Sequence, residues 1–168
     1  IGVMAMRPAF VRRMPGATRG FGERCIPMGI DFQILGEVEV RVQGRSLDIG
    51  HARRRSVLAC LLVDVNRPVS ADQLIDRVWA DDPPHRARNA LAAYISRIRQ
   101  LLAGVDGVRI VREPGGYVLK AVTASVDLYV FRQCVAAARA AATPTQAASL
   151  FDEALACWRG EPLAAVLR

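Results

Sequence analysis

Lysine is nearly absent from this chain. Lys120 is the only lysine among 23 basic residues, and all the others are arginine. The formal net charge of +7 favours a polyanionic partner, although an arginine bias also arises from codon usage in a GC-rich genome. The net charge is +4 over residues 1–29, +3 over residues 30–122 and zero over residues 123–168. The positions of the arginines along the sequence are therefore a better guide to their binding partner than the net charge.

Catalytic and metal-binding patterns are also missing. The four cysteines, at positions 25, 60, 134 and 157, form no CxxC pair, which excludes the usual zinc spacing and a disulfide framework. His51 and His85 stand in arginine-rich stretches without a carboxylate and a nucleophile nearby. We therefore expect no enzyme activity, no catalytic residue, no metal and no cofactor. Cys60, Cys134 and Cys157 should be thiols buried in helices.

Long apolar runs are lacking as well. No segment approaches the roughly 18 residues of a membrane span, and residues 1–27 contain no continuous apolar stretch of the signal-peptide kind. Residues 1–28 are rich in glycine, proline and arginine, so we expect a disordered basic extension. The sequence predicts a cytoplasmic protein without a membrane partner.

The first ordered pattern has the period of β-strands. Apolar and polar residues alternate in "IDFQILG" and "EVEVRVQ", and Gly36 and Gly44 separate the segments, which predicts a three-stranded antiparallel sheet over residues 30–49. From residue 51 the period changes. In "HARRRSVLACLLVDVN" the apolar residues recur three and four apart, as on one face of a helix, and Asn66 can end that helix in a left-handed conformation.

Two further helices and a hairpin follow. Ser70 and Gln73 have the spacing of a capping box at the start of the second helix, and the third helix runs from about Arg86 to Ala103. "VRIVREPGGYVLKA" predicts a hairpin whose turn has Pro114 and Gly115 at its centre. A sheet, three helices and a hairpin, in this order along the chain, are typical of an α+β winged helix. We assign residues 29–122 to this fold. The third helix then takes the recognition position.

The remainder of the chain predicts two antiparallel helices. "VDLYVFRQCVAAARAAA" is the first, and "TPTQAASLFDEALACWRG" the second, with Thr143 as its N-cap and Pro144 in its first turn. Together they resemble one unit of an all-α tetratricopeptide-like array, of which about three are normally needed to bury a core. We assign residues 123–168 to such a partial helical domain.

The third helix has an outer face suited to the DNA major groove. Residues 83–105 contain four arginines and no acidic residue. Arginine can bond a guanine edge at two points, asparagine can do so for adenine, and alanine allows close approach to a thymine methyl. A merely solvated face would normally intersperse glutamate for i,i+4 pairs. The residues spaced along this face are Arg86, Asn89, Ala93, Arg97 and Gln100, flanked by Ala92, Ser96 and Arg99.

At this point the chain resembles a known family. "RPVSADQLIDRVWADDPP", "YISRIRQLL" and "GGYVL", in this order, are similar to the SARP/AfsR-type transcriptional activators and their EmbR-like relatives. The resemblance covers about residues 30–168. It implies an OmpR/PhoB-type winged helix, a two-component-like output domain, joined to part of a bacterial transcriptional activation domain. It also implies sequence-specific binding to double-stranded DNA, commonly to direct repeats by two copies side by side, and contact with RNA polymerase holoenzyme.

The resemblance also implies roles for individual residues. It assigns base contacts to Asn89, Ala92, Ala93 and Arg97, and backbone contacts to Tyr94, Ser96 and Arg99. From their places on the same helix we add Arg86 to the base contacts, and Arg88 and Gln100 to the backbone contacts. The hairpin at 108–121 becomes a wing with Arg109, Arg112 and Tyr117, in which Arg109 or Arg112 enters the minor groove or remains an exposed strand charge. The segment "ADDPPH" (80–85) matches a loop that contacts RNA polymerase in relatives, or it is a plain connector. The segment "HARRR" (51–55) lies at a helix N-terminus, where it either contacts a phosphate or is simply solvated.

One alternative function belongs to a different class. In this alternative the chain is an interaction module. Its helices at 127–160 bind and sequester a kinase, a sigma factor or a full-length relative, and the winged helix is a remnant. The shortness of the helical segment favours this alternative, and a specific operator favours the DNA-binding regulator.

Overall fold

The computed structural model describes residues 29–161. The basic extension expected over 1–28 lies outside the described residues. Three antiparallel strands come first: β1 (Ile30–Gln33), β2 (Glu39–Val42) and β3 (Arg45–Leu47), in the spatial order β1-β2-β3. Phe32 pairs with Val40, and Val40 pairs with Leu47, so these apolar side chains share the buried face. The sheet predicted over residues 30–49 is confirmed.

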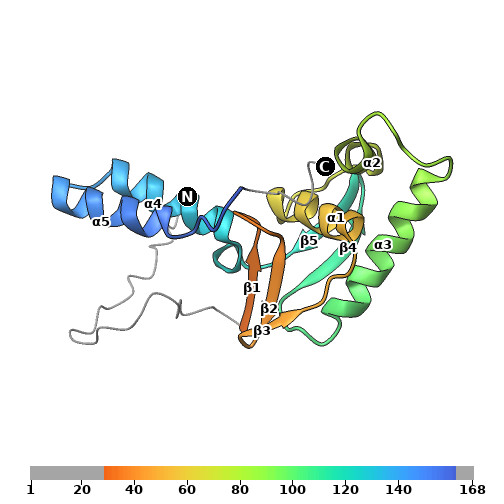
Figure 1. Ribbon diagram of the computed structural model, residues 1–168, viewed down its shortest axis with the longest axis horizontal. Helices are drawn as coiled ribbons and strands as arrows, with labels where there is room; N and C mark the ends of the chain where they lie inside the picture. Colours follow the sequence, from red (N-terminus) through yellow and green to blue (C-terminus); the bar gives the residue numbers. More distant parts are fainter. Residues whose placement is uncertain (1–28, 162–168) are drawn as a thin grey trace, which may run out of the picture.

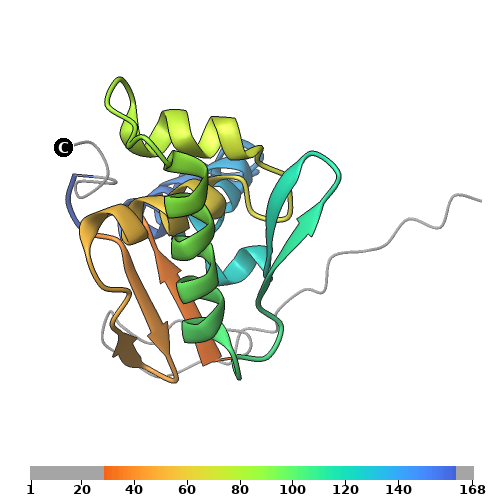
Figure 2. The same ribbon diagram turned by 90° about the vertical axis from the view of Figure 1, so that its right-hand side faces the viewer.

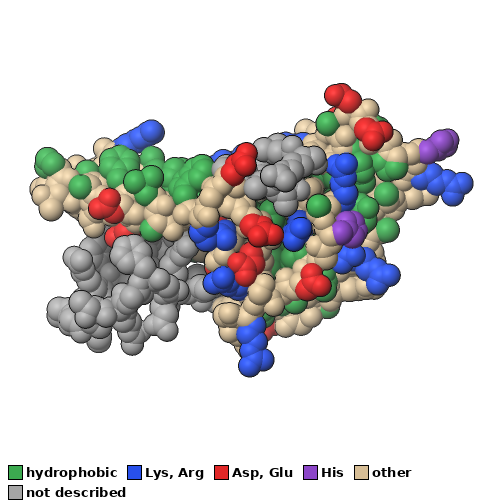
Figure 3. Space-filling model, viewed as in Figure 1, with side chains coloured by type: hydrophobic (Ala, Val, Ile, Leu, Met, Phe, Trp, Pro, Cys, Tyr) green, Lys and Arg blue, Asp and Glu red, His purple; other side chains and the backbone are tan. Residues whose placement is uncertain are grey.

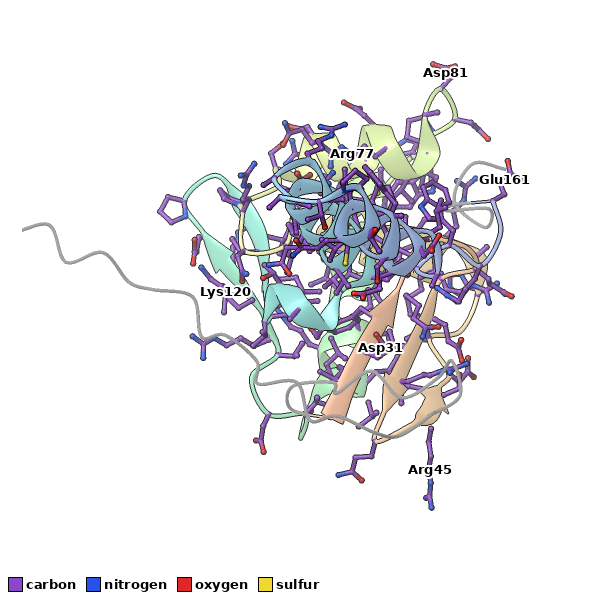
Figure 4. All side chains as sticks on the ribbon, turned by 90° about the vertical axis from the view of Figure 1, so that its left-hand side faces the viewer. Asp31, Arg45, Arg77, Asp81, Lys120 and Glu161 are labelled. Atoms are coloured by element: carbon purple, nitrogen blue, oxygen red, sulfur yellow. The ribbon has the colours of Figure 1, made fainter. Side chains whose placement is uncertain are left out.

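Strand β1 departs from the predicted alternation. Its polar residues Asp31 and Gln33 are only 8% and 5% exposed, so neither face of the strand is solvated. The amide of Gln33 donates a hydrogen bond to the carboxylate of Asp31, which provides each side chain with a polar partner. Figure 4 shows Asp31 on the strand, whereas Arg45 on β3 points away from the body.

Three helices follow the sheet and share one apolar core with it. They are α1 (Ala52–Val63), α2 (Ala71–Trp79) and α3 (Ala87–Leu102). Helix α1 is the central one and buries Val57, Leu58, Leu61 and Leu62, as its spacing predicts. At the start of α2 the hydroxyl of Ser70 accepts from the backbone N–H of Gln73, whose side chain accepts from the N–H of Ser70, so the capping box is present.

The loop after α1 is held by the segment that follows the hairpin. Helix α1 ends at Val63, and the left-handed Asn66, with φ 64°, comes three residues later. The side chain of Asn66 donates to the carbonyl of Ala121 and accepts from its N–H. Asn66 therefore anchors the loop as well as redirecting the chain.

The predicted hairpin is formed by β4 (Arg109–Glu113) and β5 (Gly116–Lys120). Gly115 has a φ of 100°, as the third position of a type II turn requires. The backbone groups of Val69 and Tyr117 exchange two hydrogen bonds of 2.9 Å, so the α1–α2 loop lies against the hairpin. Figure 2 shows the hairpin rising beside α3.

Two helices form an arm that projects from this body. They are α4 (Asp127–Arg139) and α5 (Pro144–Leu155), preceded by the short η2 (Thr123–Ser125), and α4 and α5 are here called the helical arm. Figure 1 shows the arm to the left of the winged helix. The hydroxyl of Thr143 accepts from the N–H of Gln146, so the predicted N-cap is confirmed.

Asp127 joins the arm to the sheet. Its carboxylate, 1% exposed, accepts hydrogen bonds from the N–H groups of Ile34 and Leu35 just beyond β1. The guanidinium of Arg159 lies 3.2 Å from the same carboxylate, and the N–H of Arg159 donates to the carbonyl of Leu35. The first residue of α4 and the segment after α5 are thus fixed at one end of β1.

The prediction that three cysteines are buried in helices is confirmed in full only for Cys60, since Cys134 on α4 is not fully buried and Cys157 lies two residues after α5. Cys60 and Cys157 are buried, and Cys134 is partly buried. Burial raises the pKa of the Cys60 thiol to about 11, because a thiolate would lose its hydration in the core. Within residues 29–161, no three potential metal-ligating side chains lie together, and no helix has the length and hydropathy of a membrane span.

Candidate nucleic-acid interface

Helix α3 presents one apolar side to the body and one polar side to solvent. Leu91, Ile95, Ile98 and Leu102 are buried against α1 and α2, which contact α3 along its length. Figure 2 shows α3 crossing the front of the molecule with its opposite side open. The exposed residues, here called the outer face of α3, are Arg88, Asn89, Ala92, Ala93, Ser96, Arg97, Arg99 and Gln100.

The centre of the outer face consists of small or unengaged side chains. Asn89, Ala92, Ala93 and Arg97, which the resemblance assigns to base contacts, are all exposed. In the described part of the chain, the side chains of Asn89 and Arg97 have no hydrogen-bond or ion-pair partner. Arginine stays protonated at all ordinary pH values, so Arg97 carries an uncompensated positive charge. A side chain of this kind can donate two hydrogen bonds to a guanine edge.

Two arginines at the edges of the outer face are already held by the protein. The Nε of Arg99 donates to the carbonyl of Ile110 at 2.9 Å, which fixes the guanidinium beside β4 and leaves its terminal nitrogens free to donate. Arg88 lies 2.5 Å from Asp72 on α2. Both members of that pair are about two-thirds exposed, so solvent weakens the interaction. Sequence reasoning missed Asp72 and Ile110, because no local spacing connects them to α3.

Tyr94 is turned inward from the outer face. Its ring is stacked with that of Trp79 at 6.1 Å between centroids, and His51 approaches it edge-on at 5.1 Å. The three aromatic rings come from α3, from the end of α2 and from the residue before α1, so they fix the position of α3. Tyr94 is half-buried, which leaves part of its surface for the backbone contact that the resemblance implies.

The N-terminus of α3 is open to solvent. Its N-cap is Arg86, whose side chain makes no capping bond, and its first turn has no acidic residue. The first backbone N–H groups and the positive end of the helix dipole are therefore uncompensated. His85, Arg86 and Arg88 line a shallow hollow at this end. These charges would all favour an anion such as a phosphate.

The α2–α3 loop projects beyond this end. The N–H of Asp82 donates to the carbonyl of Trp79 at 3.0 Å, and Ala80 between them has φ 48° and ψ −118°. This is the backbone of a type II′ turn, which normally takes glycine at that position. Figure 4 shows Asp81 at the tip of the loop, directed away from the body. The predicted "ADDPPH" loop is thus a defined, exposed projection.

The wing residues differ in accessibility. Arg109 is exposed and has no side-chain partner among residues 29–161. Arg112 donates to the hydroxyl of Tyr117 at 2.9 Å, and its guanidinium lies 5.0 Å from the centre of that ring. Tyr117 is only 7% exposed. Both arginines are therefore exposed on β4, but Arg112 is held against Tyr117, which is part of the core.

The arginines at the start of α1 interact mainly within the protein. Arg53 donates to the carbonyl of Val78 at the C-terminal end of α2, where the helix dipole favours a cation. Arg55 lies 3.6 Å from Glu37, and Arg54 extends along Gly50. All three side chains are partly buried. The sequence left a phosphate contact and a solvated start as alternatives. The start is only partly solvated, and the phosphate contact stays a prediction, since the Nε atoms of Arg54 and Arg55 have no hydrogen-bond partner within residues 29–161.

Two family models match the chain in succession. Residues 49–119 match "Transcriptional regulatory protein, C terminal", and residues 126–168 match "Bacterial transcriptional activator domain". The first range contains the three helices and most of the hairpin, and the second contains the helical arm.

Individual regulators are similar over most of the chain. AfsR of Streptomyces griseus is 36% identical over 138 residues, which are 80% of this chain and 14% of that protein. EmbR of Mycobacterium tuberculosis is 34% identical over 148 residues, 84% of this chain and 38% of that protein. MoaR1 of the same organism is 36% identical and is covered to 45% of its length. The chain therefore spans less than half the length of these relatives.

The fold is also similar to a solved structure of one relative. A structure of M. tuberculosis EmbR in complex with a low-affinity phosphopeptide has a TM-score of 0.73 and 34% identity over 82% of this chain and 38% of that one. The chain belongs to the SARP family of AfsR-, EmbR- and MoaR1-like transcriptional regulators, with an OmpR/PhoB-type winged-helix DNA-binding domain followed by a segment of the bacterial transcriptional activator domain.

Proposed function

We propose that this chain regulates transcription by inserting the outer face of α3 into the major groove of a specific double-stranded DNA site. The proposal rests mainly on one observation: the inner side of α3 is packed into the protein core, whereas its outer face exposes basic and polar side chains and has no acidic residue. Leu91, Ile95 and Ile98 hold α3 in the body, and Arg97 and Asn89 lack protein partners over residues 29–161. Because the helix is already fixed in position, it loses little conformational entropy when its side chains bind to bases.

Different residues take different tasks in this proposal. Arg97 and Asn89 read base edges, and Ala92 and Ala93 permit close approach of the helix. The sequence predicted a base contact for Arg86, but its place at the open N-terminus of α3 favours a phosphate. Arg86, with Arg88, Ser96, Arg99 and Gln100, therefore binds phosphates and sets the register in this proposal. Arg109 is the wing residue with an unengaged guanidinium, so it, rather than Arg112, contacts the adjacent backbone or minor groove.

The partners of the complete regulator follow from its family. We extend the proposal to two copies side by side on promoter direct repeats, in the nucleoid of the cytoplasm. The loop at residues 80–85 is exposed at the end of α3 that lies beside the DNA, which supports a contact with RNA polymerase holoenzyme.

The test begins with selection of bound duplexes from a random library by the purified protein, followed by mobility-shift titration of variants on the selected site. Arg97→Ala should weaken specific binding by about 5- to 150-fold, equivalent to ~1–3 kcal/mol, and relax the preference at one base pair. Arg99→Ala should weaken binding to all duplexes alike, because it removes a phosphate contact. Arg45→Ala is the matched control, since Arg45 is exposed on β3 and directed away from the body.

The two variants distinguish the possible failures. If Arg97→Ala bound the selected duplex as tightly as the parent, α3 would not be reading the groove. If Arg45→Ala weakened binding as much as Arg97→Ala, the interaction would depend on overall charge alone. Failure of the library to yield any preferred sequence would leave the interaction-module function as the better explanation of the chain.

A further inference from the structure

Two arginines lie along the same edge of helix α3. Arg88 and Arg99 are separated by about three full turns, so their side chains leave the helix in nearly the same direction, about 16 Å apart along the axis. Each is bound to the protein through one nitrogen atom: Nη2 of Arg88 donates to Oδ1 of Asp72, and Nε of Arg99 donates to the carbonyl of Ile110. Neither side chain makes another hydrogen bond within residues 29–161, so its remaining N–H groups can donate to a ligand.

The two attachments differ in charge. Ile110 supplies a neutral backbone carbonyl, whereas Asp72 supplies a carboxylate from the first turn of α2. Over residues 29–161, the pair of Asp72 with Arg88 is the one ion pair that involves the outer face of α3. In Figure 3 the charged side chains at the right-hand edge of the molecule, where α3 lies, are basic or histidine. Asp72 therefore places a negative charge beside the surface proposed to face DNA.

The start of α2 does not require this contact. A carboxylate in the first turn is favourable for the helix dipole wherever it points. The capping box of Ser70 and Gln73 already satisfies backbone N–H groups at this end. The carboxylate of Asp72 bonds across to Arg88 on the next helix instead. The contact therefore serves something other than the start of α2.

We propose that Asp72 is a positioning residue that increases the preference of the protein for its specific site over other DNA, by holding Arg88 in place for one phosphate. The inference rests on the proposed function of α3. Asp72 touches no base and acts through Arg88. A guanidinium that is already held at one nitrogen loses less conformational entropy when a phosphate binds to its other N–H groups.

The same carboxylate opposes binding wherever the phosphate is not in that place. Its charge repels the DNA backbone, and this repulsion acts on every duplex. On the specific site α3 has one register and Arg88 meets its phosphate, so the positioning offsets the repulsion. On other duplexes the protein slides along the backbone, so a fixed orientation of Arg88 gives no gain and the repulsion remains. Asp72 thus weakens non-specific binding more than specific binding.

The experiment measures two dissociation constants on each sample of the full chain, one for the selected duplex and one for a scrambled duplex of the same length. Fluorescence anisotropy provides both. Asp72→Asn should tighten binding to the scrambled duplex by about two- to fivefold and should not tighten binding to the selected one. The preference for the selected duplex should therefore fall by at least about twofold. Because both constants come from one sample, any unfolded fraction cancels in their ratio.

Two further variants separate the positioning from the charge. Asp76→Asn is the matched control, because Asp76 is exposed one turn further along α2 and has no ion-pair partner in the described range. This variant loses the same charge but releases no arginine, so it should keep the preference. Asp72→Glu should restore most of the preference that Asp72→Asn loses, because a carboxylate at this position can still reach Arg88.

A double-mutant cycle tests whether Asp72 acts through Arg88. In an Arg88→Ala background, Asp72→Asn should tighten binding to both duplexes by the same factor, because only the repulsion is removed. The inference is overturned by an unchanged preference in Asp72→Asn, by an equal loss in Asp76→Asn, by a failure of Asp72→Glu to restore it, or by an equal loss when Arg88 is already alanine. These outcomes leave the proposed function standing, whereas a parent that prefers no duplex would remove that function and this inference with it.

Discussion

Gly116 is the residue on which the position of the wing depends most directly. Its φ is 147°, and a Cβ on it would lie 2.0 Å from the carbonyl oxygen of Val69. The backbone of Val69 is paired with that of Tyr117, so it cannot move aside without losing two hydrogen bonds. Only glycine permits the hairpin and the α1–α2 loop to approach so closely.

We predict that Gly116→Ala lowers the free energy of unfolding by about 2–4 kcal/mol, because backbone strain is added to the lost pairing. Urea titration followed by circular dichroism measures the change. Gly44→Ala is the control: its φ is 79°, but a Cβ would meet nothing within 4 Å, so it should lose only about 1–2 kcal/mol. Equal losses in the two variants would show that the contact with Val69 is unimportant.

Single residues also show which features sequence alone could predict. The capping box of Ser70 and Gln73 and the N-cap at Thr143 were predictable, because each depends on residues three apart. The enclosure of Tyr117 and the bond from Arg99 to Ile110 depend on how the hairpin packs against the helices, so the sequence pattern could not predict them. By contrast, Arg112 and Tyr117 are opposite each other in the predicted hairpin, so the register of the turn was enough to bring them together.

Among the elements, β1 and α4 are joined by one buried carboxylate. Asp127 accepts from two backbone N–H groups, of Ile34 and Leu35, and pairs with Arg159. The carboxylate ends β1 in the way that a side chain caps a helix, by accepting from N–H groups that have no partner in the strand. The helices themselves were predictable from their period, but this junction was not, because its partners lie more than 90 residues apart.

Asp127→Ala should destabilise the fold by about 2–4 kcal/mol, because two buried N–H groups lose their acceptor. Hydrogen exchange followed by NMR provides the specific readout. The amides of Ile34 and Leu35 should exchange much faster, whereas the exchange rates of amides in the middle of α1 should rise only by the amount that the loss of global stability accounts for. Asp152→Ala, which removes an exposed carboxylate, should leave both amides protected. Unchanged protection in Asp127→Ala would mean that the junction is held by the remaining contacts.

The whole molecule distributes its charge unevenly. The formal charge of +7 is concentrated in the parts that precede residue 123, and the outer face of α3 contributes arginines without acids. Residues 123–168, which contain the arm, have four acidic and four basic residues. The sequence predicted this division, but only the structure shows that the arm and the outer face of α3 are at opposite ends of the molecule (Figure 1).

Binding to the selected duplex should therefore depend strongly on salt. Each neutralised phosphate contributes about −0.9 to the slope of log K against log salt concentration. If Arg86, Arg88, Arg99 and Arg109 each neutralise one phosphate, the slope should be roughly −3 to −4. Fluorescence anisotropy across a series of salt concentrations measures it, and Arg99→Ala should make it less negative by about one. A slope near zero would be incompatible with a phosphate-bound complex.

The attachment at Asp127 also affects how the chain is completed during synthesis. A ribosome adds residues from the N-terminus, so the end of β1 is made long before residue 127 and the Arg159 that pairs with it. Until then the amides of Ile34 and Leu35 have only water as a partner. The arm must dock last, and the end of β1 stays uncapped while the chain between Ile34 and Asp127, 93 positions apart, is translated, which is most of the winged helix.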